Sequence, residues 1–210
     1  MPAVAVIPNL RHCYKYMHAT KHWGVSYSAP FTTPGSPVNV LDCWVDASDG
    51  DGPKSRSQTG YIVRLNGGPI DWGSGRQSTT SLNTAESELK ASCTAARSTV
   101  FLYRLMAEFG YPPPAPVTVW EDNTTTIKWC RSDGPNISAK NKHIDRQYFY
   151  CQALQSTVPP MIHMQHIPSV QQLADLLTKN LPRDTHARLC SRIFVDTSLQ
   201  GCGNSVLQPD

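Results

Sequence analysis

The sequence predicts an α/β protein with a mixed sheet and helices packed on the faces of that sheet. Three strand-like segments follow one another before the first long helix, and an Asn-Gly-Gly turn separates two of them. After that helix, short apolar segments alternate with helical ones, which is typical of strands joined by crossover helices. The length of 210 residues and the 40% hydrophobic content allow a sizeable core.

The first 37 residues look separate from the rest. Residues 10–27 are predicted to form a short helix that runs into a strand, and the Pro-rich stretch APFTTPGSP (29–37) predicts a domain boundary. We therefore expect an N-terminal segment with its linker at 1–37, a main domain at 38–195 and a flexible tail at 196–210.

The main domain is expected to begin with strands. In VNVLDCWVD (38–46), one face would carry Val38, Val40, Asp42, Trp44 and Asp46. TGYIVRL (59–65) and PIDWGS (69–74) flank the turn and predict a hairpin. STTSLN (78–83) is a possible further strand.

A long helix follows, with an apolar stripe over five turns formed by Leu89, Cys93, Ala96, Val100, Tyr103 and Ala107. Gly110 ends it. The remaining elements predicted are a strand at 117–122, helices at 124–130 and 141–155, a strand at 161–168, a helix that begins with a capping box at Ser169-x-x-Gln172, and an amphipathic helix at 183–195.

Charge and cysteine content exclude several classes of protein. The net charge of +3 permits nucleic-acid binding but is too small to argue for it. Seven cysteines without a CxxC pair disfavour a disulfide framework or a zinc site and favour an intracellular setting, in a cytoplasmic particle or the nucleus. Without a signal peptide, or an apolar run near the ~20 residues of a membrane span, we expect a soluble protein that is neither secreted nor membrane-bound.

Acidic residues at strand ends and helix starts predict the functional site, because ligands of mixed α/β sheets bind there. The candidates at such positions are Asp46, Glu86, Glu88, Asp122 and Asp175. Asn83-x-x-Glu86 resembles a capping box, which leaves Glu88 as the better functional candidate of the two glutamates. For Asp175 alone, a helix-start acid favoured by the helix dipole is as good an interpretation as a metal ligand.

Four converging carboxylates would require a cation. Two unit charges about 5 Å apart repel each other by roughly 3 kcal/mol at an effective dielectric constant of about 20. A ligand set made only of carboxylate oxygens suits Mg²⁺ or Mn²⁺ and does not suit zinc. Four carboxylates around two such ions suit the hydrolysis of phosphodiesters.

Five blocks occur in one order along residues 38–182: VDAS (45–48), SGRQSTTSLNTAESELKA (74–91), VWEDNTTTI (119–127), KNKHIDRQYFY (140–150) and QHIPSVQQLADLLTK (165–179). Together they resemble the ribonuclease H domain of copia-type (Pseudoviridae) LTR-retrotransposon Pol polyproteins. Residues 10–27 also resemble the segment that joins the reverse transcriptase to this domain. The chain thus resembles the C-terminal end of such a polyprotein, or the product of a gene derived from one.

The resemblance implies a fold, an activity and partners. The fold would be the ribonuclease H-like fold, a five-stranded mixed sheet of order 3-2-1-4-5. The activity would be endonucleolytic cleavage of the RNA strand of RNA–DNA hybrids during reverse transcription, with two Mg²⁺ ions that Mn²⁺ can replace. The partners would be the hybrid and the reverse transcriptase domain of the same polyprotein, with no small-molecule cofactor.

The resemblance also implies roles for individual residues. Asp46 would bridge both ions, Glu88 and Asp122 would complete one ion, and Asp175 would complete the other. His166 matches a histidine that helps product or metal release, although a polar residue at a strand end is an equally good interpretation. The candidates for nucleic-acid contacts are Arg76, Asn123, Lys140, Lys142 and Arg146, of which the last three are just as plausibly a solvated helix face.

The sequence departs from the family pattern near Asp46 and before Gln77. The family has S-D-A-D-W-A-G where this chain has Asp46-Ala47-Ser48-Asp49-Gly50, and the lysines common before the family's glutamine are reduced to Arg76. An alternative function is therefore a catalytically inactive, domesticated module that binds nucleic acid or protein. Asp42 stays unexplained, because it shares a strand face with Asp46 but lies roughly 13 Å back along the strand.

Overall fold

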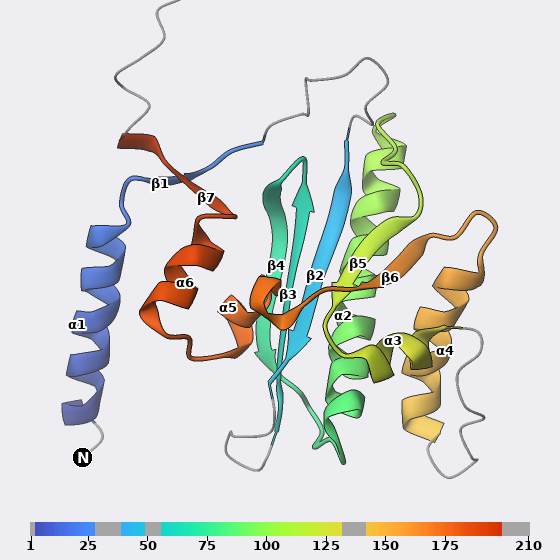
Figure 1. The fold of residues 1–210 in the computed structure, drawn as a ribbon, viewed down its shortest axis with the longest axis horizontal. Coiled ribbons are helices and arrows are strands. Elements are labelled where there is room, and N and C mark those ends of the chain that lie inside the picture. Colours follow the sequence, from blue (N-terminus) through green and yellow to red (C-terminus); the bar gives the residue numbers. More distant parts are fainter. Residues whose placement is uncertain (1–2, 28–38, 49–55, 132–141, 199–210) are drawn as a thin grey trace, which may run out of the picture.

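A computed structural model describes residues 3–27, 39–48, 56–131 and 142–198, with residues 3–6 and 142–148 placed as backbone only. Its main sheet has five strands in the order β4-β3-β2-β5-β6 (Figure 1). The strands are β2 (Leu41–Ala47), β3 (Gln58–Leu65), β4 (Gly68–Arg76), β5 (Val117–Glu121) and β6 (Ile162–His166).

The directions of these strands make the sheet mixed. β2 pairs antiparallel with β3, and β3 pairs antiparallel with β4. On its other side β2 pairs parallel with β5, which pairs parallel with β6. Counted along the chain without the short β1, this is the order 3-2-1-4-5, so the predicted fold class is confirmed.

The predicted hairpin is confirmed, and the predicted strand after it is wrong. Asn66 and Gly67 both have positive φ, 50° and 84°, as a two-residue type I′ turn between β3 and β4 requires. Residues 78–83 form no strand. Their polar groups serve the following helix instead: the Lys90 ammonium donates to the carbonyl of Thr80 and the hydroxyl of Ser81.

Helices cover both faces of the sheet (Figure 1). On one face lie α2 (Thr84–Glu108), α3 (Thr124–Cys130) and α4 (Lys142–Ser156); on the other lie α5 (Asp175–Thr178) and α6 (Arg183–Cys190). The alternation of side chains along β2 supplies both cores: Cys43 and Val45 pack into the first, and Trp44 packs into the second. The long helix at α2, the strand at β5 and the helices at α3 and α4 match the sequence prediction.

The chain after β6 differs from the prediction. Ser169–Gln171 form a 3-10 turn with no side-chain cap, so the predicted capping box is wrong. The Gln172 side chain is buried instead, where its Nε2 donates to the Val45 carbonyl at 2.8 Å and its Oε1 accepts from the Ala174 amide at 3.2 Å. Asp175 consequently stands in the first turn of α5, not in the second turn of a longer helix.

A strand of the N-terminal segment pairs with a strand near the end of the described chain. The predicted N-terminal helix and strand are present as α1 (Ala3–Ala19) and β1 (Trp23–Val25). The predicted helix at 183–195 is too long, because α6 ends at Cys190 and Phe194–Asp196 form β7, which pairs antiparallel with β1. The predicted domain boundary at 29–37 lies outside the described residues, and so does most of the predicted tail.

Within the described ranges, no helix combines the length and the apolar character that a membrane span needs.

Candidate active site

Three carboxylates meet at one end of the sheet. Asp46 lies near the end of β2, Glu88 in the second turn of α2, and Asp122 directly after β5. One oxygen from each lies within 4.8 Å of the others. The parallel pairing of β2 with β5, in which Trp44 lies opposite Trp120, brings the ends of these strands together and with them the two aspartates.

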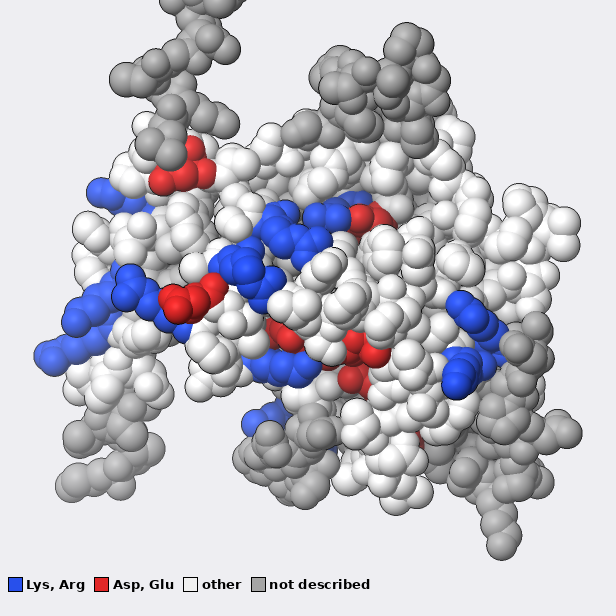
Figure 2. Space-filling model, in the orientation of Figure 1, with Lys and Arg blue, Asp and Glu red and all other residues white. Residues whose placement is uncertain are grey.

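The three carboxylates line a cleft, and two of them are buried. The cleft has a volume of about 270 Å³, and the carboxylates of Asp46, Glu88 and Asp122 line it together with Thr84, Asn123 and Lys179. Asp46 is 1% exposed and Glu88 is 3% exposed, whereas Asp122 is partly exposed. Acidic atoms in the middle of one face of the molecule adjoin basic ones in Figure 2.

Glu88 is a buried acid whose surroundings oppose its negative charge. Burial, followed by the charges of Glu121, Asp46 and Asp122, raises the pKa of Glu88 to about 11. Its Oε2 is buried and accepts no hydrogen bond from the part of the chain that the structure describes. A divalent cation among these oxygens would supply the missing partner, and the all-carboxylate donor set fits a hard cation such as Mg²⁺ or Mn²⁺.

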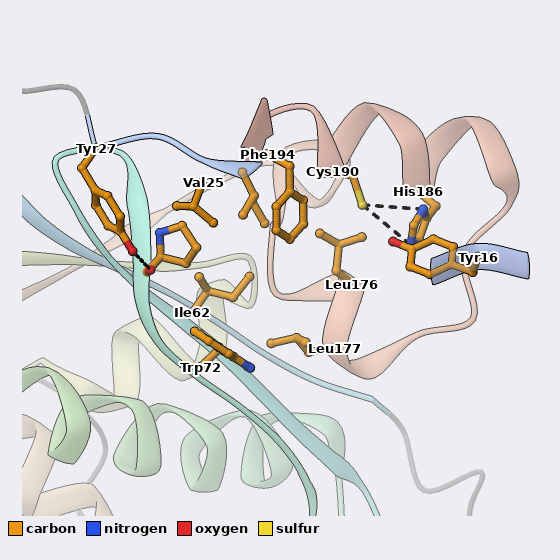
Figure 3. A pocket seen from close by; sticks show the side chains of 12 residues that line it. Tyr16, Val25, Tyr27, Ile62, Trp72, Leu176, Leu177, His186, Cys190 and Phe194 are labelled. Atoms are coloured by element: carbon orange, nitrogen blue, oxygen red, sulfur yellow. Dashed lines mark hydrogen bonds between the residues drawn. The ribbon is translucent and has the colours of Figure 1, made fainter. Parts of the chain in front are cut away.

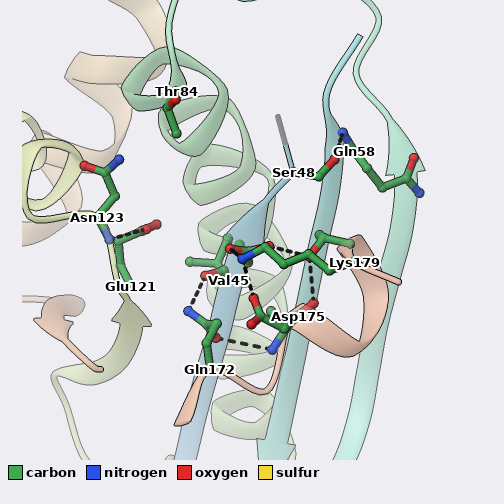
Figure 4. Close-up of polar contacts among 12 residues, drawn as sticks. Val45, Ser48, Gln58, Thr84, Glu121, Asn123, Gln172, Asp175 and Lys179 are labelled. Atoms are coloured by element: carbon green, nitrogen blue, oxygen red, sulfur yellow. Dashed lines mark hydrogen bonds and ion pairs between the residues drawn. The ribbon is translucent and has the colours of Figure 1, made fainter. Parts of the chain in front are cut away.

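Asp175 joins the group through a lysine. The Nζ of Lys179 lies 2.7 Å from Asp175 Oδ1 and 3.0 Å from Asp46 Oδ1, so one ammonium group bridges the two carboxylates (Figure 4). The Thr178 hydroxyl donates to the other oxygen of Asp46. Asp175 is therefore linked to Asp46 by Lys179 but lies outside the compact group of three carboxylates, and its role as a fourth ligand stays a prediction.

Burial and charge together shift the pKa values of Asp175 and Lys179. Burial raises the pKa of Asp175 to about 6, although the hydrogen bond from Lys179 opposes this change. Burial lowers the pKa of Lys179, but the hydrogen bond to Asp175 and the negative charge of Asp46 outweigh it, so this pKa lies above its usual value. Lys179 thus stays charged and offsets part of the negative charge of the cleft.

Sequence reasoning missed Lys179 and Glu121. Glu121 is fully buried, and its two oxygens accept hydrogen bonds from the Asn123 amide and the Ser92 hydroxyl, each at 3.0 Å. Burial raises the pKa of Glu121 well above its usual value. The sequence carries only part of the signal: Glu121 continues the buried alternation of Val117 and Val119, and Lys179 lies one helical turn after Asp175. The contacts of Glu121 with Ser92 and of Lys179 with Asp46 are visible only in the fold.

The other predicted site residues lie around the cleft or outside the described side chains. His166 is exposed at the end of β6, where it pairs in register with Glu121. Asn123 lines the cleft and caps α3, because its Oδ1 accepts from the amides of Thr125 and Thr126. Arg76 is exposed at the end of β4. Lys140 lies outside the described residues, and so do the side chains of Lys142 and Arg146.

Glu86 has the structural role that the sequence predicted. Asn83 accepts a hydrogen bond from the Glu86 amide at 2.9 Å, and the Glu86 carboxylate accepts from the Leu82 amide at 2.8 Å. Its other oxygen pairs with Lys90 at 2.8 Å. Glu86 therefore holds the start of the helix that carries Glu88.

Asp42 is explained by its neighbour on the next strand. It lies directly opposite Arg64 in the β2–β3 register, and the guanidinium donates to both carboxylate oxygens, at 3.0 and 2.6 Å. The same guanidinium lies 5.1 Å from the ring centre of Trp44. Asp42 thus belongs to a cross-strand ion pair and not to the acid cleft.

A separate apolar cavity of about 330 Å³ lies between the N-terminal segment, the β3–β4 hairpin and the C-terminal helices (Figure 3). Tyr16, Ile62, Trp72, Leu177 and Phe194 are among the residues that line it. Tyr27 closes it against the hairpin by donating a hydrogen bond to the Pro69 carbonyl at 2.9 Å. This cavity shares no lining residue with the acid cleft.

Comparison with known proteins finds no matching family model. The retrovirus-related Pol polyprotein from transposon RE1 of Arabidopsis thaliana is 27% identical over 197 residues, which are 93% of this chain and 13% of the relative. The corresponding polyprotein from transposon TNT 1-94 of Nicotiana tabacum is 28% identical over 155 residues, or 73% of this chain and 11% of the relative. The chain therefore spans about one eighth of the length of these relatives.

Among solved structures, the N-terminal RNase H domain of rv2228c from Mycobacterium tuberculosis aligns with 73% of this chain and 97% of its own. The sequence identity is 13% and the TM-score is 0.47.

Proposed function

We propose that this chain, a relative of the retrovirus-related Pol polyproteins of transposons, is a ribonuclease H that cuts the RNA strand of RNA–DNA hybrids. The observation that carries the proposal is the convergence of Asp46, Glu88 and Asp122 in one cleft, with Asp175 beside it. Such a concentration of carboxylates at strand ends suits phosphodiester hydrolysis assisted by divalent cations.

The residues that would hold two Mg²⁺ or Mn²⁺ ions are Asp46, Glu88 and Asp122 for one, and Asp46 with Asp175 for the other. When bound, the ions supply the charge that activates a water molecule and stabilises the leaving oxygen. The proposal is supported by the Oε2 of Glu88, which is buried without a hydrogen bond from the described residues.

The protein's own groups hold these acids in place. The Thr178 hydroxyl and the Lys179 ammonium hold the carboxylate of Asp46. The Gln172 side chain holds the same strand by donating to the Val45 carbonyl. Glu88 is fixed because its helix is capped by Asn83. Lys179 places a positive charge at the rim of the cleft, where it favours the approach of a phosphate group.

The partners follow from the same proposal. The substrate would be an RNA–DNA hybrid, and the relatives are Pol polyproteins much longer than this chain, which supports a reverse transcriptase domain of the same polyprotein as a second partner. We also propose that residues 38–195 form the nuclease domain and that the protein works inside the cell.

The proposed activity is tested by incubating the chain with a labelled RNA–DNA hybrid and Mg²⁺. Asp46→Asn should reduce cleavage of the RNA strand by at least about 1,000-fold, or about 4 kcal/mol of transition-state stabilisation, because Asp46 is shared by both proposed ions. The matched control is Asp184→Asn, which makes the same chemical change at an exposed position in α6 and should cut normally. The proposal fails if the wild-type chain does not cut, or if Asp46→Asn cuts equally well.

A second candidate function is a catalytically inactive module. It is favoured by the ion pairs of Lys179, which neutralise part of the charge on Asp46 and Asp175 without any metal. Metal titration separates the two functions, because a cation that binds only the folded state raises its stability. The nuclease should gain thermal stability as Mg²⁺ or Mn²⁺ rises to millimolar concentration, by about 2.7 kcal/mol at 100 times the Kd. An unchanged melting temperature would favour the inactive module.

A further inference from the structure

A second polar groove begins at Lys179, the residue that also lines the acid cleft. It has a volume of about 440 Å³ and lies between the ends of β2, β3 and β4 and the segment around α5. The polar residues that line it include Ser48, Arg56, Gln58, Arg76, Lys179 and Asn180. Figure 4 shows Ser48, Gln58 and Lys179 along this end of the sheet.

The sign of the charge changes from the acid cleft to this groove. Among the described residues that line the groove there are two arginines and one lysine, and no aspartate or glutamate. The cleft on the other side of Lys179 is lined by three acids. A polyanion that crosses both would therefore be attracted by the groove and would approach the acids beside a fixed ammonium group.

A third hollow lies beyond the groove, and the lysine that lines it, Lys90, is buried and paired with Glu86 at 2.8 Å. Arg76 also lines this hollow, of about 470 Å³, together with Lys90 and with hydroxyl groups such as those of Thr59, Ser78 and Thr79. None of the described residues that line this hollow is acidic. The cleft and the groove are neighbours that share Lys179, and the groove and the third hollow share Arg76.

The floor of the groove is held by hydrogen bonds between distant parts of the chain. The Gln58 amide donates to the Ser48 hydroxyl at 3.1 Å, and the Gln58 side chain donates to the Ser74 hydroxyl at 2.9 Å. Ser74 in turn donates to the Leu177 carbonyl at 2.6 Å. These contacts tie β3 and β4 to α5, so the groove keeps a fixed position relative to Lys179 and the acids.

We propose that this groove binds the phosphodiester backbone of the strand being cut, with Arg56 and Arg76 each contacting a phosphate next to the one in the acid cleft. The inference rests on the proposed function, since that function places the scissile phosphate at the acids. Guanidinium groups and neutral donors on a rigid floor suit phosphate and sugar oxygens, and such contacts position the strand without reading its sequence.

The test measures binding of an RNA–DNA hybrid at several salt concentrations, in an Asp46→Asn background with Mg²⁺ so that cleavage does not interfere. Arg56→Gln with Arg76→Gln should weaken binding about ten-fold or more at low salt. The slope of log Kd against log salt concentration should fall by about two, one for each lost phosphate contact. The matched control is Arg97→Gln with Arg104→Gln, which removes the same charge from the exposed face of α2.

The outcomes separate this inference from the proposed function. The inference is supported if the salt slope falls for Arg56→Gln with Arg76→Gln and not for the control variant. If the groove variant and the control variant change binding equally, or if neither changes it, the inference is overturned. This holds even when the wild-type chain cuts the hybrid. If the wild-type chain binds the hybrid through Arg56 and Arg76 but does not cut it, the groove stands and the proposed function fails. Circular dichroism and melting temperature confirm that each variant is folded.

Discussion

The fold changes the pKa of Asp175, and this change predicts how stability depends on pH. Its pKa is raised from 3.8 to about 6, mainly by burial. Between these two pH values the folded chain holds a proton that the unfolded chain has lost. The free energy of unfolding should therefore fall as pH rises from about 4 to about 6 when no divalent cation is present.

Urea unfolding at stepped pH in EDTA checks this prediction. Asp175→Asn should remove this part of the pH dependence, because an amide does not titrate. Asp184→Asn, at an exposed position, should keep it. An Asp175→Asn variant with the same pH profile as the wild type would contradict the assignment to Asp175.

Single residues also show how far sequence reasoning reaches. Asp46, Glu88 and Asp122 were predictable because each stands at a strand end or a helix start, and parallel strands bring such ends together. Lys179 was not, since its interaction with Asp46 crosses 133 residues and depends on where α5 begins. Glu121 looked like the last residue of a strand, and only packing against Ser92 shows that its carboxyl is buried.

Among the secondary-structure elements, strands β2 and β3 are joined by the ion pair between Asp42 and Arg64. Arg64→Met should lower the free energy of unfolding by about 2 kcal/mol, because it leaves the partly buried Asp42 carboxylate without its bidentate partner. Asp42→Asn in the same chain should recover part of this loss. A double-mutant cycle by urea unfolding should give a coupling energy of about 1 kcal/mol or more. Simple additivity of the two changes would show that the pair does not stabilise the strands.

Elements defined by local pattern were the predictable ones. The hairpin followed from its Asn-Gly turn and α2 from its apolar stripe and capping residues. The region after β6 was not predictable in this way. Gln172 has the spacing of a capping residue, but its side chain reaches the backbone of β2, 127 residues away. β7 is likewise a strand only because β1, far away in the sequence, pairs with it.

At the scale of the whole molecule, the N-terminal segment packs against the C-terminal elements through aromatic contacts. Trp23 stacks on Phe194 with ring centres 5.7 Å apart, and Tyr16 meets His186 edge-on at 5.7 Å. The five strands and the first core contain none of the described residues of this segment, although Tyr27 donates a hydrogen bond to the Pro69 carbonyl of β4. The main sheet and its helices should therefore survive without this segment, at a cost set by the lost contacts.

Deletion of residues 1–27 tests this division. The shortened chain should fold and lose at least about 2 kcal/mol of stability, because the aromatic contacts, the β1–β7 pairing and the Tyr27 hydrogen bond are lost together. Urea unfolding measures the loss, and near-native circular dichroism shows that the sheet persists. Trp23→Ala in the full chain is the milder comparison and should lose less. A shortened chain that does not fold would mean that the predicted boundary at 29–37 divides one domain.

The β1–β7 ladder also has a mechanical consequence. Trp23 lies opposite Asp196, and Thr197 donates to the His22 carbonyl at 2.8 Å, so the flanking chain enters and leaves at the same end of this short ladder. A force applied to the chain on both sides of residues 22–197 would break the hydrogen bonds of the β1–β7 ladder one after another. It would not load all of them at once in shear. Under such a load the β1–β7 pairing would separate first. The force would reach β2 and β5, the strands next to the acid cleft, only after that pairing had broken.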